Sequence, residues 1–211
     1  VTLGEAPAGV AYAVYNSNDK SLNFYKKASA PASTDTETVY VFDENNCSYS
    51  FDNPAPWSEH GEQVDSVTVV DAGIQPTSLN YWFVSFIYCK SFDVVNLDTS
   101  KVVSADQCFA DCEYLEVLDI STWDVSNLKS AGSMFAAMFA VKTIYANHTW
   151  DSFTPINTDA IFHMNVAIEG GAGSKYDVYG AGQWDGEKYI YGTLAHIDGG
   201  TSNPGYFTAK V

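Results

Sequence analysis

Apolar residues recur through the middle of the chain at a fixed spacing. Four six-residue segments share the pattern apolar-x-x-apolar-x-apolar: VDSVTV, CKSFDV, LEVLDI and VKTIYA. They begin at positions 64, 89, 115 and 141, so the offsets are 25, 26 and 26 residues. Short apolar segments with polar positions between them predict strands. A period in the twenties predicts stacked coils that contribute one strand each.

Other columns repeat with the strands. Phe83, Phe109 and Phe135 recur at 26 residues, and Phe162 follows at 27. A second apolar column holds Trp57, Trp82, Cys108, Met134 and Ile161. One coil cannot bury its own apolar face, so neighbouring coils must present matching side chains in register. We therefore predict an α/β solenoid: a short leucine-rich-repeat array with a parallel sheet on one face, closed by β-rich segments at both ends.

The turn after each strand also repeats, as LDTSKV (97–102) and WDVSNL (123–128), with a degenerate copy at Trp150 and Asp151. Asp98 and Asp124 stand where a carboxylate can accept backbone N–H bonds and begin a short helical turn. Calcium binding is the alternative. Acids spaced one coil apart would not converge on a single ion, so capping is favoured.

The two ends are expected to close the array, because bare terminal coils would expose apolar columns. Residues 1–56 are predicted as a β-rich N-terminal cap with strands at AYAVY, SLNFYKK and TVYVFD. Residues 57–168 are predicted to form leucine-rich repeats of about 26 residues. Residues 169–211 are predicted as a C-terminal β-hairpin cap that turns at WDGEK.

The charge balance restricts the partners. The chain has 26 acidic and 10 basic residues, all of the latter Lys, and a net charge of −16. Such a charge repels nucleic acid and anionic membrane surfaces. No stretch is long and apolar enough to span a membrane, so no direct membrane insertion is expected. The absence of a signal peptide or sorting tail suggests an excised piece of a longer chain.

The stretch QCFADCEYLEVLD (107–119) raises the question of a metal or redox site at Cys108 and Cys112. Zinc and redox sites use CxxC pairs or a Cys/His quartet, and this CxxxC has no second pair nearby. Both cysteines occupy apolar columns, as does Cys89, so we expect packing rather than chemistry. The His residues do not cluster, and neither GxSxG nor a phosphate loop occurs. We therefore expect no enzyme, no cofactor and no metal.

The repeats resemble a known family. Residues 76–146, with QPTSLNYWF, SFDVVNLDTSKV, CFADCEYLEVLDISTWDVSNL, SMF and KTIYA, are similar to the BspA-like leucine-rich repeat surface proteins of bacteria. HIDGGTSNPGYFT (196–208) resembles the tail of such arrays, and AYAVYNSNDKSLNFYK (11–26) resembles the segment that precedes them. The resemblance implies an extracellular protein of host-associated bacteria with adhesive or unassigned roles. MFAAMFAVKTIYANHTW departs from the family pattern, which suggests the start of the C-terminal cap.

The outward positions of the predicted strands are the candidate binding site, because alternate side chains of a strand leave the core. They are Asp65, Lys90, Asp93, Glu116, Asp119, Lys142 and Tyr145. The sign of the side-chain charge alternates along one column of these positions, from Asp65 to Lys90, Glu116 and Lys142. This ladder either supports an exposed sheet, at no more than about 1 kcal/mol per pair, or presents a docking face.

We expect a non-catalytic, extracellular interaction module of a bacterial surface protein, cell-surface-bound or secreted. Its expected role is adhesion through a protein or glycan ligand on a host or neighbouring cell. One alternative is a structural spacer of a larger surface protein. A less favoured alternative is a glycan-active enzyme that uses acids and the tryptophans Trp123, Trp150 and Trp184.

Overall fold

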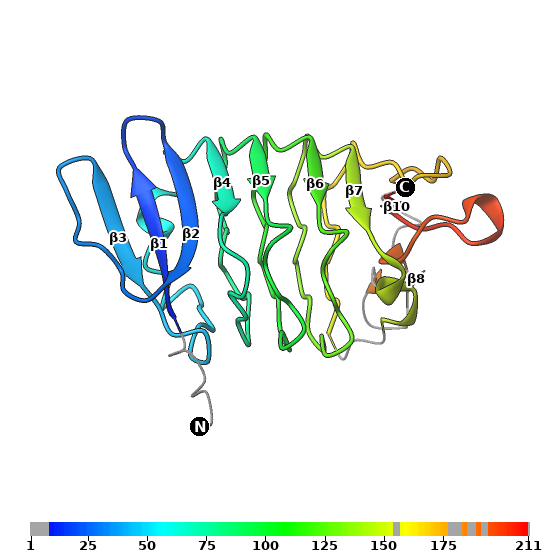
Figure 1. The fold of residues 1–211 in the computed structure, drawn as a ribbon. Coiled ribbons are helices and arrows are strands. Elements are labelled where there is room, and N and C mark those ends of the chain that lie inside the picture. The colour runs from blue at the N-terminus through cyan, green and yellow to red at the C-terminus, as the bar shows by residue number, and fades with distance from the viewer. Residues whose placement is uncertain (1–8, 154–156, 177–182, 185–188, 191–193, 211) are drawn as a thin grey trace, which may run out of the picture.

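The computed structural model describes residues 9–153, 157–176, 183–184, 189–190 and 194–210. The molecule is a row of side-by-side coils, with the N-terminal strands at one end and the C-terminal segment at the other (Figure 1). The predicted repeat strands occur as β4 (Ser66–Val69), β5 (Ser91–Asp93), β6 (Val117–Asp119) and β7 (Thr143–Ala146). Each coil therefore contributes one short strand.

The N-terminal strands extend this row. β1 (Val10–Asn16) pairs antiparallel with β2 (Ser21–Lys27) and with β3 (Glu37–Val41). β2 then pairs in parallel with β4, which gives a five-stranded sheet in the order β3-β1-β2-β4-β5. The three predicted N-terminal strands are thus confirmed, and they join the sheet of the first coils.

The C-terminal strands are shorter. β10 (Phe207–Ala209) pairs in parallel with β7, and β7 with β6, in a second sheet. β8 (Gln183–Trp184) and β9 (Tyr189–Ile190) pair antiparallel, as the predicted hairpin requires. Most of the WDGEK turn lies outside the described residues.

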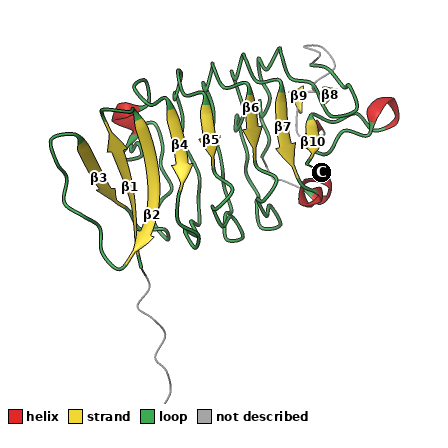
Figure 2. Cartoon of the chain, turned by 45° about the horizontal axis from the view of Figure 1, so that its top comes forward, coloured by secondary structure: helices red, strands yellow, loops and turns green. Residues whose placement is uncertain are grey.

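The predicted fold class is wrong. The described residues contain no α-helix, and their helical segments include the 3-10 turns η1 (Ser58–His60), η2 (His148–Ser152) and η4 (Gly200–Ser202). The strands do not form one parallel sheet either, because β5 and β6 belong to different sheets. Figure 2 shows strands joined by irregular loops. The architecture is mainly β, without the α/β arrangement of a leucine-rich repeat.

The backbone between the strands explains why no helix forms. Tyr81, Gln107, Ser133 and Ala160 have positive φ, and so do the residues four positions further on. A left-handed residue at every fourth position interrupts a right-handed helix. The N–H groups bond to the next coil instead: those of Tyr81 and Phe83 donate to the carbonyls of Asp106 and Cys108, both at 3.0 Å.

The predicted phenylalanine column is confirmed. Phe83 and Phe109 stack at 5.5 Å between ring centroids, Phe109 and Phe135 at 6.1 Å, and Phe135 and Phe162 at 5.5 Å. All four rings are fully buried in one continuous apolar core that runs from β1 to β10. The column links successive coils and holds the outward residues at fixed positions.

No helix in the described part of the chain has the length and apolar character needed to cross a bilayer.

Candidate functional site

The outward residues of the strands lie where the spacing predicts. Ser66 is in register with Ser91, and Val117 with Thr143, so the residues before them pair as neighbours. The result is Asp65 beside Lys90, and Glu116 beside Lys142. We call this surface the strand face and define it by Asp65, Lys90, Asp93, Glu116, Asp119, Lys142 and Tyr145.

The charges on the strand face pair only partly as the ladder predicts. Lys142 Nζ lies 2.7 Å from a Glu116 carboxylate oxygen, and the hydrogen bond and charge of Lys142 lower the pKa of Glu116. Asp65 is 3.9 Å from Lys20 rather than paired with Lys90. Lys90 forms no ion pair within the described residues and is exposed. It is therefore a cation available to a partner.

The C-terminal end supplies a cation that the sequence pattern does not reveal. Lys210 forms an ion pair with Asp119. Burial alone would raise the pKa of Asp119, but hydrogen bonds from Lys210 and Ser121 lower it. The Asp119 carboxylate in turn raises the pKa of Lys210, and the more distant Tyr145 and Asp93 act in the same direction. This part of the strand face is thus neutralised within the chain.

An exposed tyrosine pair borders the strand face at the break between the two sheets. The rings of Tyr88 and Tyr114 lie 5.4 Å apart, and each residue is about half exposed, at 49% and 51%. Val117, the first residue of β6, is also 49% exposed. A hollow of about 460 Å³ is lined by Lys90, Tyr114, Glu116 and Ala140. Apolar surface and a cation without an ion pair among the described residues therefore meet here, where β5 and β6 do not pair.

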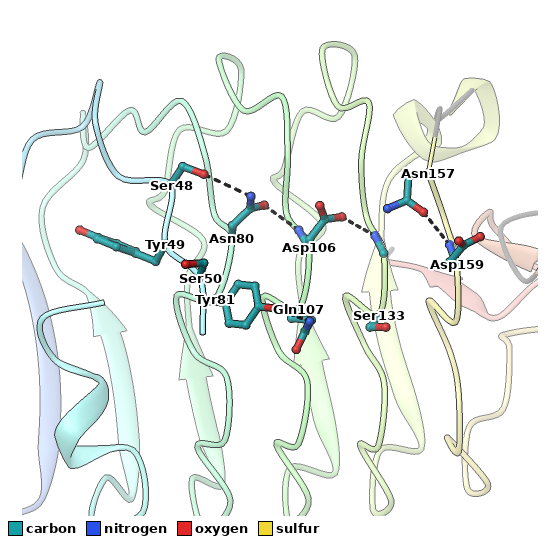
Figure 3. Close-up of a pocket in the computed structure, with 11 residues that line it drawn as sticks. Ser48, Tyr49, Ser50, Asn80, Tyr81, Asp106, Gln107, Ser133, Asn157 and Asp159 are labelled. Atoms are coloured by element: carbon teal, nitrogen blue, oxygen red, sulfur yellow. Dashed lines mark hydrogen bonds between the residues drawn. The ribbon is translucent and has the colours of Figure 1, made fainter. Parts of the chain in front are cut away.

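A polar groove lies on another flank of the coils and was not identified from the sequence. It has a volume of about 480 Å³ and crosses successive coils (Figure 3). Its walls include Asn80, Tyr81, Asp106, Gln107 and Asn157. The signal was present in the sequence as SLNYWF, SADQCF, SAGSMF and NTDAIF, which place a polar or small residue three positions before each stacked Phe. We call this surface the polar groove.

Hydrogen bonds between coils fix the side chains of the polar groove. One Asp106 oxygen accepts from the Ser130 hydroxyl and the Gly132 N–H, both at 2.6 Å. Asn80 Oδ1 accepts from the Asp106 N–H at 2.8 Å and the Ser104 hydroxyl at 2.6 Å. Each coil thereby orients the polar side chain of its neighbour.

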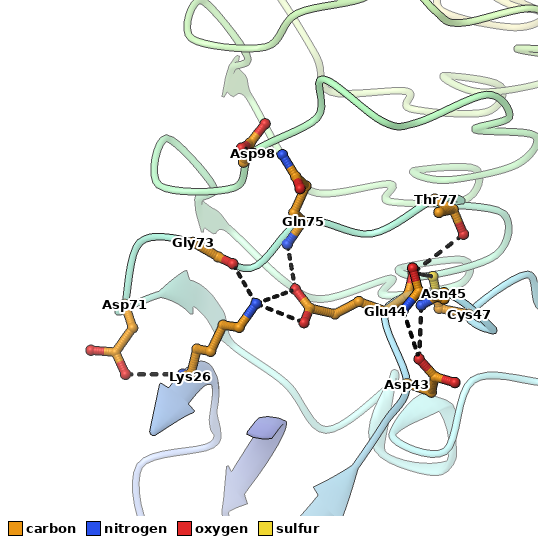
Figure 4. A network of polar contacts seen from close by, with 10 residues as sticks. All are labelled: Lys26, Asp43, Glu44, Asn45, Cys47, Asp71, Gly73, Gln75, Thr77 and Asp98. Carbon is orange, nitrogen blue, oxygen red and sulfur yellow. Dashed lines mark hydrogen bonds and ion pairs between the residues drawn. The ribbon is translucent and has the colours of Figure 1, made fainter. Parts of the chain in front are cut away.

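A separate polar network fastens the N-terminal strands to the first coil (Figure 4). Lys26 Nζ contacts Glu44 at 2.8 Å and donates to the Gly73 carbonyl at 2.7 Å. Glu44 also accepts from the Gln75 N–H, and Gln75 Nε2 donates to Asp98 at 2.7 Å. Each of these groups has a partner inside the protein, so the network is structural.

The turn aspartates accept backbone N–H bonds as predicted, but the predicted helical turns after them are wrong. Asp98 accepts from the Ser100 N–H at 3.0 Å, and Asp124 accepts from the Ser126 N–H at 2.9 Å. They shape turns rather than start helices. Asn147, not Asp151, caps η2, whereas Asp151 accepts from Ile197 N–H. No group of three His, Cys, Asp or Glu residues in the described part of the chain could hold a metal ion.

The cysteines pack in the core, as expected for Cys89, Cys108 and Cys112. All four cysteines of the chain, Cys47 included, are free and fully buried. Burial raises the pKa of the Cys89 thiol to about 12 and that of Cys108 well above its ordinary value.

Two of the three tryptophans suggested for glycan contact are also in the core. Trp123 and Trp150 are each 1% exposed, and the Trp123 indole N–H donates to the Val94 carbonyl. They are not available to a ligand, which corrects that expectation. The side chain of Trp184 lies outside what the structure describes.

Comparison with protein families gives one match. Residues 77–174, slightly less than half of the chain, match the family described as "Mycoplasma protein of unknown function, DUF285". This stretch contains β5, β6, β7 and most of the polar groove. No curated protein matches the chain, and no solved structure does either.

Proposed function

We propose that this chain is a non-catalytic interaction module of a bacterial surface protein, one that adheres to a protein on a host or neighbouring cell. The similarity to a Mycoplasma family supports a bacterial source. The resemblance of the sequence motifs to the BspA-like surface proteins supports an extracellular location. The adhesive role rests on the surface described above.

The observation that carries the proposal is the exposed tyrosine pair beside Lys90. Tyrosines are frequent anchors of protein interfaces, because they combine a large apolar ring with a hydroxyl. Tyr88 and Tyr114 contact each other, and Val117, three residues after Tyr114, is also exposed. The favoured partner inserts an apolar side chain beside the rings and places a carboxylate near Lys90.

The surrounding ion pairs support selectivity. Glu116 with Lys142, and Asp119 with Lys210, keep their side chains in defined positions. Exposed pairs of this kind contribute little to stability. Complementary charges at the edge of an interface instead exclude wrong partners and speed association. A spacer would not need an exposed aromatic pair, so binding is favoured over that alternative.

The test is an array of host-matrix and bacterial surface proteins, probed with the 211-residue chain. Variants Tyr114→Ala and Lys90→Glu are expected to lose the strongest signals. Lys101→Glu makes the same charge change at another exposed lysine and is expected to retain them. Absence of any bound protein would favour the spacer, and binding that survives both strand-face variants would reject this surface.

A further inference from the structure

The polar groove has a composition that differs from the strand face. Its walls offer amides from Asn80, Gln107 and Asn157, a carboxylate from Asp106, and the phenol of Tyr81. No Lys or Arg lines it. The chain carries a net charge of −16, so an anionic ligand would be repelled. Neutral ligands that both donate and accept hydrogen bonds fit this set.

Spare hydrogen-bonding capacity remains in the groove. A carboxylate accepts about four hydrogen bonds, and Asp106 Oδ1 receives two, from Ser130 and Gly132. The Ser104 hydroxyl lies 3.2 Å from Asp106 Oδ2 but has its shorter contact, at 2.6 Å, with Asn80. The Asn80 amide has two N–H groups, one of which donates to Ser48 at 3.2 Å. Acceptor capacity on Asp106 and donor capacity on Asn80 thus remain on two residues that line the same groove from neighbouring coils, which matches a hydroxyl group or a pair of neighbouring hydroxyls.

The aromatic wall is fixed in place. Tyr81 has φ of 59°, its N–H donates to the Asp106 carbonyl, and its hydroxyl accepts from Gln107 Nε2 at 2.5 Å. The ring is partly exposed and stands beside the amides and the carboxylate (Figure 3). A ring held beside polar groups offers a flat apolar surface to the C–H face of a sugar.

Gly132 keeps the coils close at the centre of the groove. A Cβ at this position would lie 2.7 Å from Asn157 Nδ2 and 3.2 Å from Asp106 Oδ1. The absent side chain lets the two neighbouring polar groups approach the backbone. Because hydrogen bonds already fix these groups, little conformational entropy is lost when a ligand binds.

We propose that the polar groove is a second binding site, specific for neutral saccharides. The Tyr81 ring supports one face of a sugar, while Asn80 and Asp106 bond its hydroxyls. A repeated groove that crosses several coils suits an oligosaccharide better than a single sugar. This site is independent of the strand face, since Tyr81 and Tyr114 belong to different surfaces.

The experiment uses printed neutral, amino, sialylated and sulfated oligosaccharides, followed by calorimetry with the strongest neutral ligand. Tyr81→Ala is expected to weaken binding at least tenfold and Gln107→Ala to weaken it less. Tyr114→Ala makes the same change beside the strand face and should bind the saccharide as the unaltered chain does. Circular dichroism and thermal melting verify that each variant is folded.

Several results would overturn the saccharide site. The proposal fails if no neutral saccharide binds or if anionic glycans bind more strongly than neutral ones. It also fails if Tyr81→Ala binds the neutral saccharide as tightly as the unaltered chain does. Saccharide binding lost in Tyr114→Ala but kept in Tyr81→Ala would place the sugar on the strand face instead. Failure of the saccharide site with intact protein binding leaves the proposed adhesive function standing, so the two proposals are separable.

Discussion

Replacing Phe109 by alanine tests the stacked core most sharply. Phe109 is fully buried, and its ring lies between those of Phe83 and Phe135 at 5.5 and 6.1 Å. It also contacts Phe92 at 5.4 Å and Trp123 at 5.8 Å. Removing a buried phenylalanine costs about 3–5 kcal/mol. Because Phe109 contacts four aromatic rings, we expect a loss in the upper half of this range, about 4–5 kcal/mol.

The assay is equilibrium unfolding in urea, followed by circular dichroism and tryptophan fluorescence. Phe51→Ala is the matched control, since Phe51 is 87% exposed and its loss is expected to stay within about 0.5 kcal/mol. If the alanine variant does not fold, Phe109→Leu replaces it in the experiment. Its expected loss of unfolding free energy is about 1–2 kcal/mol. Equal losses for Phe109→Ala and Phe51→Ala would refute the stacked column.

Three further predictions concern single side chains. Burial alone would raise the pKa of Asp198, but hydrogen bonds from Ser174 and from backbone N–H groups lower it to about 2. Because the folded pKa is below the unfolded one, Asp198 contributes roughly 2 kcal/mol above about pH 5, lost as pH falls towards 2. In urea unfolding, Asp198→Asn should therefore reduce the difference in unfolding free energy between pH 7 and pH 3. A difference equal to that of the unaltered chain would contradict this role of Asp198. The Cys108 thiol should resist alkylation at pH 8 until urea unfolds the chain, and fast labelling of the folded protein, read by mass spectrometry, would contradict its burial. Trp57→Phe removes the indole N–H that donates to the Trp82 carbonyl at 2.7 Å and also part of a fully buried ring system; calorimetric melting should show a loss of about 1–3 kcal/mol for the hydrogen bond together with the cost of the cavity, and no loss would contradict both the bond and the burial.

The repeat made part of the fold predictable. Phe83, Phe109 and Phe135 recur at the spacing of one coil, and so do the strands, because stacking imposes the same packing on each coil. The loop geometry was not predictable. Tyr81 and Gln107 have positive φ, although glycine and asparagine are the residues that normally mark such turns. Hydrogen bonds between coils, invisible in a single segment, compensate for that strain.

The site was predictable to a smaller extent. The outward positions follow from strand alternation, and the pairing of Glu116 with Lys142 follows from adjacency. The partner of Asp119 is Lys210, which is brought there by the parallel pairing of β10 with β7. No local pattern encodes a contact between residues 91 positions apart. The polar groove was missed because hydrophobic periodicity selects the buried residues and ignores the polar columns between them.

The measurement that tests the central claim most directly is the dissociation constant for the strongest protein ligand from the array. It is determined for the unaltered chain, for Tyr114→Ala and for Phe51→Ala. Both substitutions remove an exposed aromatic ring, but only Tyr114 stands beside the strand face. Binding through that face predicts at least tenfold weaker affinity for Tyr114→Ala and unchanged affinity for Phe51→Ala. Equal affinities for all three proteins would contradict it.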